Sequence, residues 1–140
     1  WCSDVCSSDL DYEYTQNNPQ KHGTVSAEIL DNLLPSRAIN AIKGHNYIHT
    51  GYMPATTLDK ALIAADAISG LIIATALVMP EKTMEEVNNS TVLKKMKDHS
   101  FAKGCDRKKI NLIQDIGIDT KDFIKMSLSA LKDIHSDLGL

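Results

Sequence analysis

The chain has few aromatic residues, few cysteines and no excess of basic charge, and each scarcity excludes a class of protein. Aromatic side chains make up 5% of the 140 residues and the formal net charge is −3, so the sequence offers no concentrated basic and aromatic surface for a nucleic-acid backbone. We therefore expect no nucleic-acid partner. The three cysteines, Cys2, Cys6 and Cys105, are an odd set without the spacing of a zinc finger, which favours a reducing cytoplasm.

The first ten residues lack helical or strand periodicity, and they lack the basic start and long apolar core of a signal peptide. Residues 4–10 read DVCSSDL, which resembles the translated end of a common sequencing-library adapter. We therefore expect residues 1–10 to be a non-native segment. Residues 11–140 are expected to form a single domain, the C-terminal portion of a protein truncated at its N-terminus.

The remaining sequence predicts an all-α fold. Apolar residues recur at helical spacing between Gly and Pro turns, and no alternating strand pattern persists. In the first helix we expect Val25, Ile29, Leu30 and Leu33 to face inward. The predicted helices, joined by short turns with one helical turn near 84–87, cover residues 22–34, 36–45, 58–79, 91–98, 107–116 and 120–138.

Ala61–Met79 contains about the number of apolar residues that cross a bilayer. Asp66 near its middle would cost roughly 2.5–3.5 kcal/mol on insertion scales, and no Trp or Tyr belt flanks the run. The segment is therefore predicted to be the buried central helix of a soluble, cytoplasmic protein with no membrane partner.

Two cationic residues, Lys103 and Arg107, stand close to the start of the helix predicted at 107–116. Free amides and cationic side chains at such a position can bind an anion. A turn in which Asp106 caps the helix is the simpler interpretation, and we expect that turn.

Four side chains able to bind a metal stand in series along the chain: His22, His45, His49 and Asp66. His45 ends one predicted helix, His49 lies in the next loop and Asp66 lies two turns into the long helix, so antiparallel packing would bring them together. Imidazoles and a carboxylate can hold a divalent cation that makes water nucleophilic near neutral pH. The alternative is a non-catalytic all-helical regulatory or interaction domain, in which protein donors satisfy Asp66 and the histidines serve packing or pH response.

A family resemblance rests on four stretches: DLDYEYT (9–15), KHGTVSA (21–27), GHNYIHTG (44–51) and AADAI (64–68). Together they resemble the HD superfamily of metal-dependent phosphohydrolases, and most closely a small bacterial branch of HD-domain proteins. The resemblance covers residues 10–140. It implies a helical bundle, incomplete here at its N-terminus, that binds one or two divalent cations and hydrolyses a small phosphate ester or nucleotide-like substrate.

The resemblance assigns roles to individual residues. His22 and His45 match the later histidine ligands of the family, and Asp66 matches its closing aspartate. His49 is implied to bind a second metal or to contact the substrate phosphate, so His49 and Asp66 are the residues expected to take part in catalysis. Ser8-Asp9 stands where the family has its His-Asp pair; the signature histidine is absent, while Asp9 can fill the aspartate position.

The implied cofactor is a divalent metal, Mn, Fe, Ni, Zn or Mg, bound by His22, His45, His49, Asp66 and Asp9. A neighbouring carboxylate can fix the tautomer of a metal-binding imidazole by accepting its other N–H. The candidates for that role are Asp11, Glu13 and Asp59. Because one ligand of the pair is missing, activity of this chain is expected to be reduced or absent. The sequence gives no indication of oligomeric state.

Overall fold

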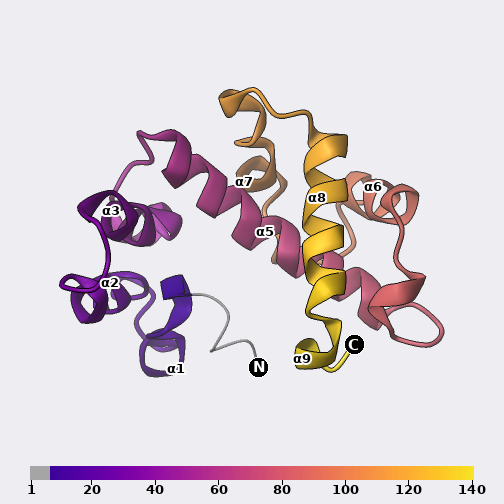
Figure 1. The fold of residues 1–140 in the computed structure, drawn as a ribbon, viewed down its shortest axis with the longest axis horizontal. Coiled ribbons are helices and arrows are strands. Elements are labelled where there is room, and N and C mark those ends of the chain that lie inside the picture. The colour runs from indigo at the N-terminus through magenta and orange to yellow at the C-terminus, as the bar shows by residue number, and fades with distance from the viewer. Residues whose placement is uncertain (1–6) are drawn as a thin grey trace. The chain divides into compact units, whose positions relative to one another are not determined.

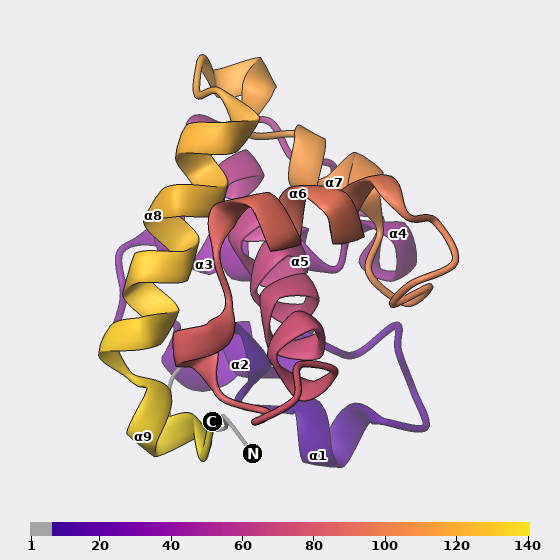
Figure 2. The ribbon, with the colours of Figure 1, turned by 90° about the vertical axis from the view of Figure 1, so that its right-hand side faces the viewer.

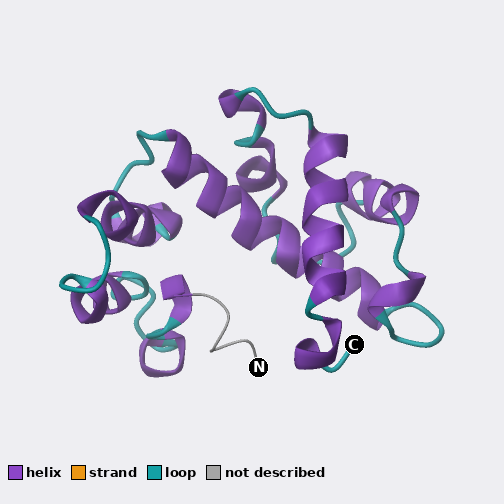
Figure 3. Cartoon of the chain, viewed as in Figure 1, coloured by secondary structure: helices purple, strands orange, loops and turns teal. Residues whose placement is uncertain are grey.

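The structure, a computed structural model, describes residues 7–140, and these residues form helices and no strand (Figure 3). The predicted all-α fold is confirmed. The elements are η1 (Ser7–Asp9), α1 (Tyr12–Thr15), α2 (Thr24–Leu30), α3 (Ser36–His45), α4 (Tyr47–Thr50), α5 (Thr57–Leu77), η2 (Met84–Glu86), α6 (Asn89–Lys97), α7 (Arg107–Asn111), η3 (Gln114–Ile116), α8 (Thr120–Asp133) and α9 (His135–Leu138) (Figure 1).

Contacts between residues divide the chain into two compact units, which meet in sequence between Ile63 and Ala64. Each unit has its own apolar core. The expectation of a single domain over residues 11–140 stays a prediction. Residues 1–6 lie outside the described part of the chain, and the non-native origin expected for residues 1–10 stays a prediction as well.

The first unit is built on α2 and α3, which pack against each other and against η1. Its core consists of the buried side chains Ala27, Ile39 and Ile42, with Leu30, Leu34 and Leu62 packed around them. The side chains of α2 and the following turn that face this core are therefore those at positions 27, 30 and 34. The predicted inward stripe is wrong at two positions, because Ile29 and Leu33 are 56% and 74% exposed. Both faces are apolar in sequence, and packing against α3 selects one of them.

The long helix α5 begins with a reciprocal cap. The Asp59 amide donates to Thr56 Oγ1 (3.2 Å), and the Thr56 amide donates to Asp59 Oδ2 (2.8 Å). Of the described helices, α5 alone is long and apolar enough to cross a membrane, and 44% of its most apolar window is buried within the structure. Its assignment to a soluble protein stays a prediction.

The second unit packs its helices around the part of α5 after Ile63. α8 lies beside α6 in both views of the ribbon (Figures 1 and 2). The residues of α5 that face this core recur every three or four positions, as a buried helix face requires. The fully or nearly buried core side chains are Ala64, Ala67, Ile68, Leu71, Ile72, Ala76, Met84, Val87, Val92, Ile110, Ile113, Phe123, Ile124 and Leu128.

Arg107 organises the turn between α6 and α7. Its two Nη atoms donate to five backbone carbonyls, those of Lys95, Asp98, Phe101, Ala102 and Cys105, at 2.6–3.2 Å. Asp106 caps α7 by accepting from the Lys108 amide, so the predicted capping turn is confirmed. The Arg107 guanidinium thus joins the end of α6 to the start of α7 through main-chain oxygens of the turn between them.

Candidate metal centre

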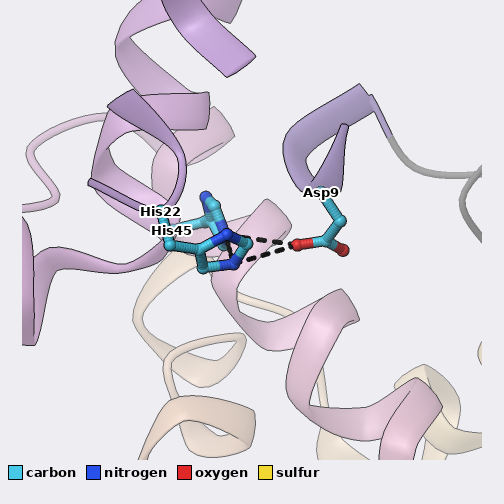
Figure 4. A group of neighbouring side chains, drawn as sticks. All are labelled: Asp9, His22 and His45. Carbon is cyan, nitrogen blue, oxygen red and sulfur yellow. Dashed lines mark hydrogen bonds and ion pairs between the residues drawn. The ribbon is translucent and has the colours of Figure 1, made fainter. Parts of the chain in front are cut away.

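Three side chains of the first unit meet at one point: Asp9 at the end of η1, His22 in the turn before α2, and His45 at the end of α3 (Figure 4). Asp9 Oδ1 lies 3.2 Å from His22 Nε2 and 3.5 Å from His45 Nε2. The two Nε2 atoms are 3.1 Å apart. His45 is buried, and His22 and Asp9 are half-buried. The group therefore faces partly toward solvent.

The triangle of ligand atoms has the size that a small divalent cation requires. Metal–ligand bonds of about 2.0–2.2 Å place two ligand atoms about 2.8–3.6 Å apart at tetrahedral or octahedral angles. The three observed separations all lie within that range. The Asp9, His22 and His45 group could therefore hold a metal ion.

The tautomer of His45 is fixed by its own helix. His45 Nδ1 lies in hydrogen-bond contact with the Ile42 carbonyl, one turn earlier in α3. A carbonyl oxygen only accepts, so Nδ1 carries the proton and the neutral ring has its lone pair on Nε2. That lone pair lies on the side of the ring where Asp9 and His22 are found.

The tautomer of His22 is fixed by Asp11. The His22 Nδ1 atom lies 2.8 Å from Asp11 Oδ1, and a carboxylate accepts, so this nitrogen is also the protonated one. Asp11 is completely buried, and its other oxygen accepts from the amides of Gly23 and Ser26 at 2.9 Å. Asp11 is therefore the carboxylate that fixes the tautomer of an imidazole in this group. The sequence had left three candidates for that role. Glu13 is exposed, and Asp59 caps α5.

Two further features hold His22 beside His45. The Asn46 side chain, directly after His45, donates to the Pro19 and His22 carbonyls at 2.7 and 3.3 Å. Gly23 adopts φ +84°, and a Cβ added there would lie 2.7 Å from His45 Cε1 and 2.9 Å from the Ile42 carbonyl oxygen. Only glycine combines this backbone conformation with such a close approach.

Asp9 and His22 shift each other's pKa. Burial raises the pKa of Asp9, but hydrogen bonds to His22 and His45 and their charges outweigh it and hold that pKa well below its ordinary value of 3.8. The hydrogen bond to Asp9 raises the pKa of His22 above its ordinary value of 6.5, against the opposing effect of burial and with support from Asp11. When no metal is bound, a proton on His22 Nε2 removes the repulsion between the Nε2 lone pairs of His22 and His45.

The structure brings together three of the five residues predicted to bind metal. His49 lies in α4, in a segment predicted to be a loop; it is exposed and is not part of the group. Asp66 is half-buried in α5, in the second unit, where its charge raises the pKa of Cys105 in addition to the larger effect of burial. The metal-binding and catalytic roles of His49 and Asp66 stay predictions.

Three supporting residues were not singled out from sequence: Gly23, Ser26 and Asn46. Gly23 and Asn46 each follow a ligand histidine directly, which is the signal that could have identified them. Ser26 gave no such signal, because its hydroxyl accepts from the Asp11 amide fifteen positions earlier. Tyr12 packs its ring edge-on to His22 with the centroids 5.7 Å apart.

Comparisons with protein-family models, with curated proteins and with solved structures gave no match to this chain.

Substitution of Gly23 tests the close approach of α2 to His45. Gly23→Ala is expected to displace the His45 ring and to weaken binding of Zn or Mn by about tenfold or more, the scale of other changes next to metal ligands. Gly51→Ala is the matched control, since Gly51 also has a positive φ (+77°) but no atom lies within 4 Å of its added Cβ. Gly51→Ala should cost about 1 kcal/mol of stability and leave metal affinity unchanged. Calorimetric titration and urea unfolding measure both effects, and equal metal affinities for the two variants would contradict the proposed contact.

Replacement of Asp11 tests the carboxylate that orients His22. Asp11→Asn introduces an N–H₂ group among three donors, so His22 is expected to lose its fixed tautomer and metal affinity to fall about 10- to 100-fold. Glu13→Gln removes the same charge from an exposed position two residues away and should leave affinity unchanged. A loss of the same size in both variants would show that net charge, and not orientation, controls binding.

The pKa shifts predict how stability of the metal-free protein depends on pH. The contribution of Asp9 is present above pH 3.8 and is lost as pH falls below it, because the pKa is lower in the folded state. The contribution of His22 is present below pH 6.5 and is lost as pH rises through the raised folded pKa. Urea unfolding should therefore show the largest stabilisation from the pair between these values, and Asp9→Asn should flatten the dependence. An unchanged pH profile in Asp9→Asn would contradict the coupling.

Proposed function

We propose that this chain acts as a metal-dependent phosphohydrolase of the HD type, on a small phosphate ester or nucleotide-like substrate. The observation that supports the proposal is the convergence of two imidazole Nε2 atoms and a carboxylate oxygen within 3.5 Å. His22 and His45 are the two histidines that the resemblance to the HD superfamily assigns to metal. Asp9, within the segment expected to be non-native, can fill the aspartate position of the family's His-Asp pair.

The donor set indicates which metals fit. Two nitrogens and one oxygen suit Mn, Fe, Ni or Zn, whereas Mg prefers oxygen ligands and fits this group least. When bound, such an ion lowers the pKa of water and polarises a phosphoryl oxygen. Three ligands leave coordination positions for water and substrate, as catalytic sites require.

The residues of the chain would divide the work as follows. Asp11 and the Ile42 carbonyl hold the two imidazoles with their Nε2 lone pairs directed inward, so little reorganisation is needed when a cation binds. Asp9 supplies the negative charge that offsets the cation. Asp66 as a further ligand and His49 as a phosphate contact belong to the proposal through the family resemblance.

One observation favours the alternative of a non-catalytic regulatory or interaction domain. A proton shared between His22 and Asp9 satisfies the same three groups without any metal, and the raised pKa of His22 favours that proton. In this alternative the cluster responds to pH and stabilises the packing of η1 on α2 and α3. Metal content therefore separates the two functions.

The test combines elemental analysis with a phosphate-release screen on p-nitrophenyl phosphate and nucleoside monophosphates in Mn, Fe, Ni or Zn. The chain is expected to bind about one metal ion per molecule, and His45→Ala should lose both metal and activity because it removes a buried ligand. His135→Ala is the control, since His135 lies in α9 and contacts the Leu140 carbonyl. No metal in the unsubstituted chain, or unchanged metal content in His45→Ala, would support the non-catalytic alternative.

A second variant addresses the missing histidine. Ser8 stands before Asp9 where the family has the histidine of its pair, so Ser8→His supplies the imidazole that this chain lacks. Ser8 is buried, and correct folding must be confirmed by circular dichroism. In folded Ser8→His, tighter metal binding with increased phosphate release is expected.

A further inference from the structure

The second unit contains an open cavity of about 320 Å³ formed where the end of α6, the start of α7, η3 and the start of α8 come together. It is independent of the metal centre, whose three residues all belong to the first unit. Its walls include Leu93, Met96, Lys97, His99, Arg107 and Asn111.

The charge of the cavity is of one sign. Lys97, His99 and Arg107 line it and no carboxylate does, although the chain as a whole carries a net charge of −3. Asp98, which lies between the first two in sequence, does not line the cavity, and its carboxylate accepts hydrogen bonds from the amide and hydroxyl of Ser100. A local excess of positive charge in an acidic protein favours an anionic ligand.

Arg107 gives this charge a fixed position. Its two Nη atoms donate to five carbonyls, and no carboxylate is among the residues that line the cavity with it. The half-buried guanidinium is thus fixed in place by main-chain dipoles. A bound anion would be attracted to the guanidinium, because this half-buried environment screens the two charges less than bulk water does.

The size and the apolar wall restrict the ligand further. A volume near 320 Å³ lies at the small end of the range for small-molecule sites, about 300–1,000 Å³. Leu93 and Met96 offer an apolar surface, while the Asn111 amide can donate to or accept from a polar group.

We propose that this cavity is a binding site for a small organic anion, a phosphate or carboxylate that carries an apolar or aromatic group. The Lys97 ammonium donates to the acidic group, the fixed charge of Arg107 attracts it, and Leu93 and Met96 contact the apolar part. Because the site uses none of the metal-binding residues, binding does not require a metal and does not depend on the proposed phosphohydrolase function.

Amide chemical shifts of the metal-free, ¹⁵N-labelled chain provide the test, with three probes. Phenylphosphonate, which cannot be hydrolysed as an ester, is expected to shift the amides of Lys97, His99 and Asn111 and to bind more tightly than inorganic phosphate, which lacks the ring. Benzamidine has a similar ring but a positive charge and should leave these amides unchanged. Shifts confined to the amides around His22 and His45, or an equal response to benzamidine, would overturn the proposal.

Two lysines of α6 supply matched variants. Lys97→Gln is expected to weaken phenylphosphonate binding about threefold, the scale of an exposed ion pair, whereas Lys94→Gln removes the same charge outside the cavity and should leave binding unchanged. Equal weakening by the two variants would show attraction by overall charge alone and would overturn the site. Absence of any shift at millimolar phenylphosphonate would do the same.

Discussion

The buried carboxylate of Asp11 is the interaction on which the first unit depends. Burying a carboxylate costs free energy unless hydrogen-bond donors surround it. Asp11 is fully buried, and the His22 imidazole and the amides of Gly23 and Ser26 all donate to it. Gly23 is the N-cap of α2 and Ser26 lies in its first turn, so the same charge stabilises the start of that helix and orients the histidine before it. Helix position and ligand orientation are therefore coupled through one side chain.

The Asp9, His22 and His45 group requires a positive charge because of this arrangement. With both Nδ1 atoms engaged, two lone pairs and a carboxylate oxygen face one another within 3.5 Å. Either a proton or a metal ion can relieve the repulsion, and the two candidate functions differ in which of them occupies the position. The geometry is common to both, so the competition between proton and metal, set by pH and metal concentration, determines the state of the cluster.

Local patterns in the sequence predicted much of this structure. The bounds of α3 follow from residues that act within a few positions, and they match the prediction. The place of His22 beside His45 was implied by the family resemblance and not by spacing. The orientation of α2 was predicted incorrectly at Ile29 and Leu33, because two apolar faces compete and only tertiary packing decides between them. The donors to Asp11 lie up to fifteen positions away, a separation at which no helical or turn pattern carries information.

Arg107 shows a different relation between sequence and structure. The groups that it holds between Lys95 and Cys105 are main-chain oxygens, which every amino acid possesses. These hydrogen bonds therefore constrain the path of the chain and not the side chains of the turn, among which Phe101, Ala102 and Cys105 pack against the core. An insertion or deletion in the turn would move the oxygens out of reach of one guanidinium, so Arg107 constrains the length of the segment.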